Sequence, residues 1–70
     1  MGLTLIDIGR KVKVARKQRR VRQVDLARLS GLSIDTIRKL EQGKSTSTIK
    51  TLLAISAVLN KRLVIFFDEM

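Results

Sequence analysis

The chain of 70 residues contains no cysteine and no histidine. The first absence excludes disulfides and thiolate ligands, and the second excludes imidazole ligands and the commonest general base of enzymes. Acidic residues are few, and no two lie three or four residues apart, the spacing of neighbours on a helix face. They are Asp7, Asp25, Asp35, Glu41, Asp68 and Glu69. We therefore expect no metal, no other cofactor and no enzymatic activity.

Long apolar runs are also lacking. None approaches the ~18 residues that a membrane-spanning helix needs, and the chain carries no signal-peptide pattern. We expect a cytoplasmic protein without a membrane partner. A domain of this length buries only about 60% of the surface that its unfolded chain exposes. Association with a second copy would therefore help to stabilise it.

Positive charge is abundant. Fifteen lysines and arginines against six acids give a net charge of +9 and a pI near 11.3, which points to a polyanionic partner. Residues 10–22 contain eight of these basic residues and no acid. A solvated helix face alone explains such a run poorly, so we expect part of it to face phosphates.

Apolar periodicity predicts a first helix over residues 5–19. Thr4 and Asp7 have the spacing of a capping pair at its start. Apolar residues then recur every three or four positions and predict a narrow buried stripe, made of Leu5, Ile8, Val12 and Ala15.

Residues 23–40 have the pattern of a helix-turn-helix. The second helix is expected over residues 23–30, with Gly31 supplying the positive φ of the turn and Ser33 capping a third helix over residues 34–42. The expected core contacts are Leu26, Ala27, Leu32, Ile37 and Leu40, with Leu29 a further candidate. A helical projection places four polar side chains outward, namely Asp35, Arg38, Lys39 and Gln42.

A loop and a fourth helix follow. Ser47 or Thr48 is expected to cap a helix over residues 49–59, and Asn60 to end it in the left-handed conformation. Its predicted buried side comprises Ile49, Leu52, Leu53, Ser56 and Leu59. The preceding loop offers small or basic donors that could reach phosphates, which are Lys44, Ser45, Thr46 and Ser47.

Residues 63–67 are five consecutive apolar residues with high β-propensity, which favours a strand. A lone strand needs a partner, so the same strand of a second subunit is expected to pair with it antiparallel. The predicted dimer interface is Leu63, Val64, Ile65, Phe66 and Phe67. A terminal helix packed on its own core is the alternative, which a run of five residues leaves open. Residues 1–60 are thus expected to form the helical domain and residues 61–70 the dimerisation tail.

The pattern from Ile8 to Asn60 resembles the Xre/Cro-type helix-turn-helix regulators, which include lambdoid phage repressors and small antitoxins of the HipB type. The residues that carry the resemblance are Arg16, Gln23-x-x-Leu26-Ala27, Gly31-Leu32-Ser33, Ile37, Leu40-Glu41-x-Gly43-Lys44, Thr51-Leu52 and Leu59. The resemblance implies an all-α, lambda-repressor-like domain of four or five helices, to which the C-terminal strand would be added.

The resemblance also implies roles for individual residues. The base-reading positions correspond to Ile34, Asp35 and Lys39, with Arg38 and Thr36 as neighbours. Phosphate contacts correspond to Gln23, Ser33, Gln42 and Lys44, and we add Arg22, Thr36, Ser45 and Thr46 to this group. Arg16 and Glu41 correspond to a partly buried salt bridge between the first and third helices. Arg22 stands where the family usually has a Ser or Thr helix cap.

The chemistry of these residues suits the grooves of DNA. Lys39 can donate to guanine, Asp35 can accept from cytosine N4, and Ile34 can contact a thymine methyl group. We therefore expect a homodimeric repressor that binds a palindromic operator on double-stranded DNA, in a bacterial or phage context near the nucleoid. The alternative is an antitoxin that binds a toxin protein and represses its own operon.

Overall fold

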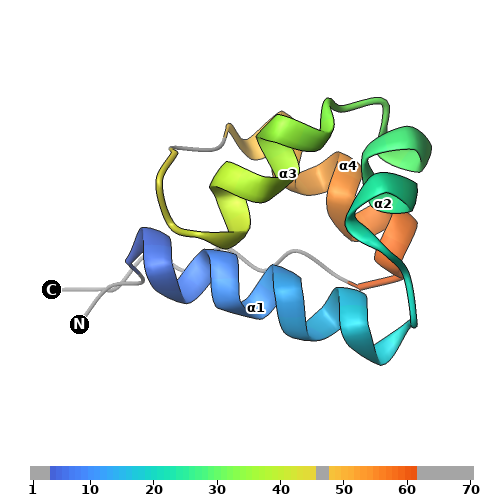
Figure 1. The fold of residues 1–70 in the computed structure, drawn as a ribbon, viewed down its shortest axis with the longest axis horizontal. Helices are drawn as coiled ribbons and strands as arrows, with labels where there is room; N and C mark the ends of the chain where they lie inside the picture. Colours follow the sequence, from blue (N-terminus) through green and yellow to red (C-terminus); the bar gives the residue numbers. More distant parts are fainter. Residues whose placement is uncertain (1–3, 46–47, 62–70) are drawn as a thin grey trace, which may run out of the picture.

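The computed structural model describes residues 4–45 and 48–61, which form an all-α domain (Figure 1). The helices of this part are α1 (Leu5–Gln18), α2 (Gln23–Ser30), α3 (Ile34–Glu41) and α4 (Ile49–Leu59). Each of them was predicted, with ends that differ by one residue at most. The predicted strand over residues 63–67 lies outside the described residues, as does Thr46.

Helix α3 lies between two other helices (Figure 1). It packs against α1 on one side and α2 on the other, while α4 contacts α1 and α2 from behind. None of the helices in the described ranges has the length and apolar character needed to cross a membrane.

The predicted N-terminal caps of α1 and α3 are present in the structure. Thr4 and Asp7 form a capping box, in which each backbone N–H donates to the other side chain at 3.1 Å. The backbone and side-chain hydrogen bonds with Thr4, together with the charges of Arg10 and Lys11, hold the pKa of Asp7 below its ordinary value. Ser33 accepts a hydrogen bond from the backbone N–H of Thr36 at 3.1 Å.

Two residues in the left-handed conformation end helices, as predicted, and a threonine caps the start of α4. Gly31 ends α2 with φ 75° and Asn60 ends α4 with φ 54°. Thr48 caps α4, and its hydroxyl accepts from the backbone N–H of Thr51 at 3.1 Å.

The core gathers residues from α2, α3 and α4. Its buried members are Leu26, Ala27, Ile37, Leu40, Ile55 and Leu59. Helix α1 covers this cluster with half-buried residues, among them Ile8, Val12 and Ala15. The predicted stripe of α1 therefore faces the core, except that Leu5 in the first turn is exposed.

The predicted buried side of α4 was partly wrong. Ile49 and Leu53 are exposed, at 57% and 52%, whereas Ile55, which the sequence did not single out, is 2% exposed. With about 100° of rotation per residue, Ile49 and Leu53 point some 120° and 160° away from Ile55. The helix is apolar on nearly every side, so periodicity does not identify the side that packs.

Leu29 was a candidate core residue of α2, and it is also exposed. The inward face of this short helix lies between Leu26 and Ala27, and Leu29 points about 110° away from its centre. Ser30 lies nearer that centre, where its hydroxyl donates to the Leu26 carbonyl oxygen at 2.6 Å.

Gly9 allows α1 and α3 to come close together. A Cβ atom at this position would overlap the carbonyl oxygen of Leu40 and lie 2.9 Å from that of Glu41. The backbone of α1 thus passes directly beside the last turn of α3. This approach fixes where the end of α3 lies relative to α1.

Candidate nucleic-acid interface

A buried ion pair joins α1 to the end of α3. Arg16 donates from Nε and Nη2 to the two carboxylate oxygens of Glu41, at 2.7 and 3.0 Å. Its third nitrogen, Nη1, donates to the Val21 carbonyl oxygen at 2.9 Å in the α1–α2 connection. The side chains of the pair are only 10% and 3% exposed. The structure thus contains the salt bridge that the resemblance implies, and Arg16 also braces the start of α2.

Glu41 holds a second side chain, that of Gln23 at the start of α2. Gln23 Nε2 donates to Glu41 Oε1 at 3.0 Å, and Gln23 is half-buried. One carboxylate therefore fixes both Arg16 and Gln23. The sequence did not predict this contact, because the two residues are distant in the chain and only the packing of α2 against α3 brings them together.

The N-terminus of α2 is open. Arg22 is the N-cap residue, and no described side chain caps the first backbone N–H groups of this helix. Such N–H groups, with the positive end of the helix dipole, favour an anion. The start of α2 can therefore receive a phosphate beside Gln23.

The side chain of Arg22 extends along α2 to Asp25 and does not cap the helix. Its Nε donates to Asp25 Oδ2 at 2.8 Å, and Arg28 lies 3.7 Å from the other oxygen of the same carboxylate. The hydrogen bond from Arg22 is the main reason why the pKa of Asp25 lies below its ordinary value. Sequence reasoning missed Asp25, although the spacing of three residues from each arginine is a signal for such pairs.

At the start of α3, two predicted residues are bonded to each other. The hydroxyl groups of Ser33 and Thr36 are 2.8 Å apart. Ile34 is half-buried and packs against the core cluster, so only part of its side chain can contact a ligand.

The outward face of α3 carries exposed polar side chains. Lys39 Nζ lies 3.1 Å from Asp35 Oδ2, with both side chains more than half exposed. Arg38 and Gln42 are exposed as well. Because Ile37 and Leu40 point into the core, this face is held away from the protein and is free of core contacts.

The chain just after α3 turns back on that helix. The Lys44 backbone N–H donates to the Lys39 carbonyl oxygen at 2.9 Å, next to Gly43. The side chain of Lys44 is exposed and Ser45 is half-buried. Thr46, the last of the predicted phosphate contacts, lies outside the described residues.

The candidate residues thus lie in three neighbouring regions of the structure. The start of α2 holds Arg22 and Gln23, the face of α3 holds the predicted base-reading residues, and the turn after α3 holds Lys44 and Ser45. Glu41 ties the first place to the second through its bond to Gln23.

Residues 12–66 match the model of a protein family described as Helix-turn-helix (HTH_3). The chain belongs to this helix-turn-helix family. It is 38% identical over 52 residues to y4mF of Sinorhizobium fredii, an uncharacterized HTH-type transcriptional regulator, in a match that spans 74% of this chain and 68% of that protein. The resemblance to Xre-type DNA-binding transcription regulators is confirmed.

Solved structures share this helix-turn-helix fold. The restriction-modification controller protein C.AhdI of Aeromonas hydrophila has a TM-score of 0.81 at 24% identity, over 83% of this chain and 88% of that one. The clp gene regulator ClgR of Corynebacterium glutamicum has the same TM-score at 22% identity, over 86% and 64%. An HTH_3 family transcriptional regulator of Vibrio cholerae scores 0.79 at 31% identity, over 83% of this chain but 33% of that protein. The family and these neighbours are regulators rather than enzymes.

Proposed function

We propose that this protein is a homodimeric repressor that binds a palindromic operator on double-stranded DNA. The observation that carries the proposal is the outward face of α3. Its exposed polar residues are backed by the fully buried Ile37 and Leu40, so the helix can enter a groove without losing core contacts. The net charge of +9 supplies the sequence-independent attraction to phosphates.

In this proposal, phosphates and bases are contacted by different parts of the interface. Gln23 and the open N-terminus of α2 bind one phosphate, while Lys44 contacts the other strand from the turn after α3. Glu41 holds the Gln23 side chain in place before DNA arrives, which lowers the entropy lost on binding.

Asp35 and Lys39 are the proposed base-reading residues. In the free protein they form an ion pair. The carboxylate of Asp35 therefore stays beside the Lys39 ammonium group when α3 enters the groove. Asp35 repels phosphates, and we therefore assign it to sequence selection rather than to affinity. Direct hydrogen bonds from such residues to base edges are worth about 1–3 kcal/mol each.

A homodimer would place two α3 helices in successive major grooves with centres ~34 Å apart. We propose that residues 63–67 form the dimer strand. The exposed Ile49 and Leu53 on α4 are further apolar surface in this small domain, which a second copy could cover.

A gel-shift titration at fixed salt tests the function. The DNA upstream of the protein's own gene is compared with random DNA of equal length, and sedimentation of the free protein gives its oligomeric state. We expect binding at least about a thousandfold tighter to the specific site. Equal affinity for both DNAs would contradict the repressor.

Two lysine truncations separate the proposed base-reading and phosphate-binding roles. Lys39→Ala is expected to cost about 1–3 kcal/mol for each half-site of the operator and to relax selectivity at one base pair in each half-site. Lys44→Ala is expected to weaken binding to all sequences alike and to make the slope of log K against log salt shallower by about 2, because each of the two subunits loses one phosphate contact. Titrations of both variants at several salt concentrations measure these effects.

The two variants are matched controls, since each removes one exposed lysine. A uniform loss with Lys39→Ala, or an unchanged salt slope with Lys44→Ala, would show that the respective role is assigned wrongly. The antitoxin alternative stays a prediction, for which copurification of the chain with a toxin protein is the test.

A further inference from the structure

All four helices of the described ranges end in the same backbone turn. In each turn, a residue with positive φ donates its N–H to the carbonyl oxygen three positions back, and the next residue donates to the carbonyl oxygen five positions back. The residues with positive φ are Gly31, Gly43, Asn60 and Arg20, at 75°, 72°, 54° and 57°. Glycine adopts this conformation freely and asparagine fairly easily, whereas other side chains are disfavoured in it. Arg20 is therefore the exception among these turns.

Within the described ranges, no ion pair of the Arg20 side chain compensates for this backbone conformation. Arg20 is exposed, and the arginines that form ion pairs there are Arg16, Arg22 and Arg28. The turn is held by its backbone hydrogen bonds and by Arg16, whose Nη1 donates to the Val21 carbonyl oxygen at 2.9 Å. Residues other than glycine with positive φ are uncommon, and strained ones cluster at functional sites. The position of Arg20 thus points to a ligand outside the domain.

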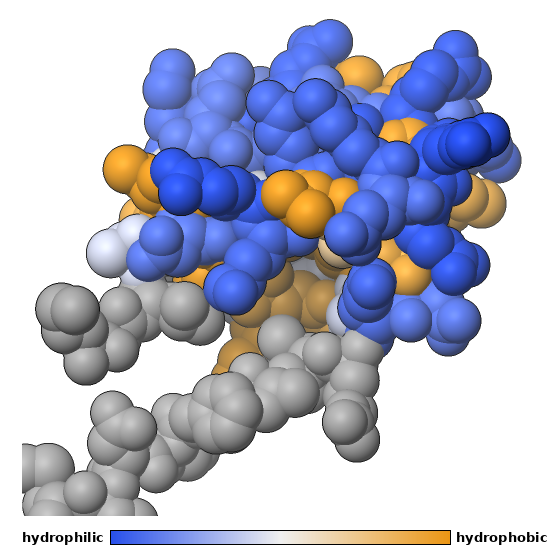
Figure 2. All heavy atoms as spheres, turned by 90° about the horizontal axis from the view of Figure 1, so that it is seen from below, coloured by the Kyte–Doolittle hydropathy of each residue, from blue (hydrophilic) through white to orange (hydrophobic). Residues whose placement is uncertain are grey.

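Positive charge surrounds this turn. Figure 2 views the domain from the side of α1 and shows a mostly hydrophilic face. The two acids that neighbouring arginines reach are already engaged, since Glu41 binds Arg16 and Asp25 binds Arg22. Three further exposed cations lie within three residues of Arg20, namely Lys17, Arg19 and Arg22. An anion from outside the domain would neutralise Arg20 and relieve the repulsion between these charges.

The turn also borders the phosphate site proposed at the start of α2. The Arg16 guanidinium donates both to Glu41 and to the Val21 carbonyl oxygen. Glu41 in turn holds the side chain of Gln23. Three residues of extended chain span at most about 10 Å, so the Cα atom of Arg20 lies within that distance of the Cα atom of Gln23. Because each DNA strand carries a phosphate about every 3.4 Å along the helix axis, a backbone held at Gln23 has further phosphates near this turn.

We propose that Arg20 binds a phosphate of the DNA backbone beside the phosphate bound at Gln23. The strained turn then contributes to affinity rather than to stability, because it holds a cation at the edge of the interface before DNA arrives. The sequence predicts that part of residues 10–22 faces phosphates, and Arg20 is the residue to which we assign that role. This inference rests on the DNA-binding function proposed above.

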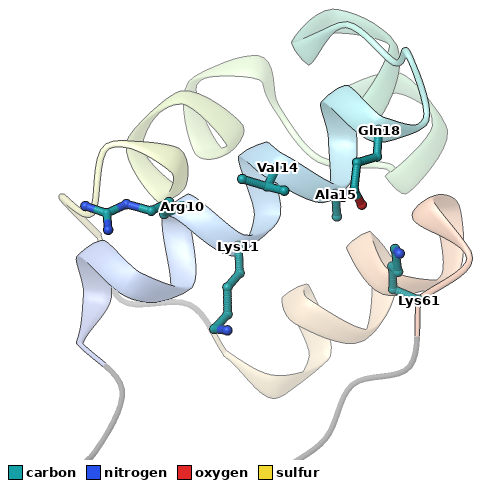
Figure 3. Close-up of a pocket in the computed structure, with 6 residues that line it drawn as sticks. All are labelled: Arg10, Lys11, Val14, Ala15, Gln18 and Lys61. Carbon is teal, nitrogen blue, oxygen red and sulfur yellow. The ribbon is translucent and has the colours of Figure 1, made fainter.

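The opposite side of α1 supplies a matched control. A hollow lies there between α1 and the end of α4 (Figure 3), lined by Arg10, Lys11, Val14, Ala15, Gln18 and Lys61. At about 100° of rotation per residue, Lys11 points some 140° away from Arg16 and 160° away from Gly9. Those two residues approach α3. Replacing the exposed Lys11 therefore removes an equal charge on the side of α1 away from α3.

Arg20→Gly is expected to stabilise the free protein and to weaken its complex with DNA. The Tm should rise by about 2–6 °C, because glycine relieves the left-handed strain. Affinity for DNA at about 0.1 M salt should fall about fivefold for each bound subunit. The slope of log K against log salt should become shallower by about 1 for each bound subunit. Circular dichroism during heating gives the Tm, and fluorescence anisotropy titrations at several salt concentrations give the affinity and the slope.

Three further variants separate the charge from the backbone. Arg20→Ala lacks the charge but keeps the strain, so it should lose as much affinity as Arg20→Gly without the gain in Tm. Arg20→Lys keeps the charge and should bind DNA within about threefold of the wild type. Lys11→Ala should leave the salt slope unchanged, because counterions are released only where a cation neutralises a phosphate.

Several results would overturn the Arg20 contact. One is an Arg20→Gly variant that binds DNA with wild-type affinity and salt slope. Another is a loss in Lys11→Ala equal to that in Arg20→Ala, which would mean that total charge decides the affinity. An Arg20→Lys variant as weak as Arg20→Ala would show that the side chain acts through the shape of the turn. A lower Tm in Arg20→Gly would overturn the strain.

The choice of DNA separates this inference from the repressor. Each variant is titrated with a random-sequence duplex and with the DNA upstream of the protein's own gene. Equal wild-type affinity for both duplexes would overturn the sequence-specific repressor. The variants would still decide the Arg20 contact in that case, since every sequence presents the same phosphates. A wild-type protein that binds neither duplex would overturn both proposals.

Discussion

Replacing Glu41 by alanine is expected to lower the free energy of unfolding by about 3–5 kcal/mol, the cost of leaving a buried charge without its partner. Arg16 would lose both hydrogen bonds to the carboxylate in a site where its side chain is only 10% exposed. Gln23 would lose its bond to the same carboxylate. A natural domain of this size has a total stability of roughly 4–10 kcal/mol, so the variant would be close to unfolding.

Urea titration followed by circular dichroism measures the change. Asp25→Ala is the matched control, because it also removes an acid that is bonded to arginine, but the arginine partners are 78% and 70% exposed. We expect that control to lower the stability far less than Glu41→Ala does, because exposed ion pairs are screened by solvent and contribute little. A double variant with Arg16→Met and Glu41→Leu should recover most of the loss, since it removes both charges and keeps the volume. Equal losses in Glu41→Ala and Asp25→Ala would contradict the buried pair.

Gly9→Ala is expected to destabilise the protein by about 2–3 kcal/mol. In an open helix the same change would stabilise by about 1 kcal/mol, because alanine is the better helix former. Here the new Cβ would overlap the Leu40 carbonyl oxygen and crowd that of Glu41. Helix α1 would have to move away from α3, which would strain the Arg16–Glu41 pair as well. The sign of the effect therefore tests the close approach directly.

Gly31→Ala provides the comparison for this variant. Gly31 has φ 75°, but nothing lies within 4 Å of its would-be Cβ. Only the left-handed backbone penalises alanine there, by about 1–2 kcal/mol. Thermal or urea unfolding of both variants gives the two values. A Gly9→Ala variant as stable as the wild type would mean that α1 and α3 are further apart than described.

The sequence predicts best where local chemistry decides. Helices α2 and α3 were found from the Ser33 cap, the turn glycine Gly31 and the helical spacing of apolar and polar positions. The side of α4 that packs was missed, because this helix is apolar nearly all round and only its contacts with α1 and α2 single out Ile55. The role of Gly9 was missed, because a glycine within a helical pattern does not indicate that another helix packs against its backbone.

The candidate site was likewise predicted from the sequence only in part. The outward positions of α3 follow from the helical repeat, and the Arg16–Glu41 pair follows from the resemblance. The bond from Gln23 to Glu41 could not be predicted, because it depends on how α2 packs on α3. The dimer strand lies outside the described residues and stays a prediction.

The exposed face of α3 makes this small domain a convenient starting point for protein engineering. Asp35, Arg38 and Lys39 are exposed, so a library of substitutions at these positions would leave the buried Ile37 and Leu40 unchanged. Surface changes of this kind usually alter stability by no more than about 0.5 kcal/mol. New recognition properties could therefore be selected without stabilising the scaffold first. Glu41 is the position on this helix that such a library should keep, because its carboxylate binds both α1 and α2.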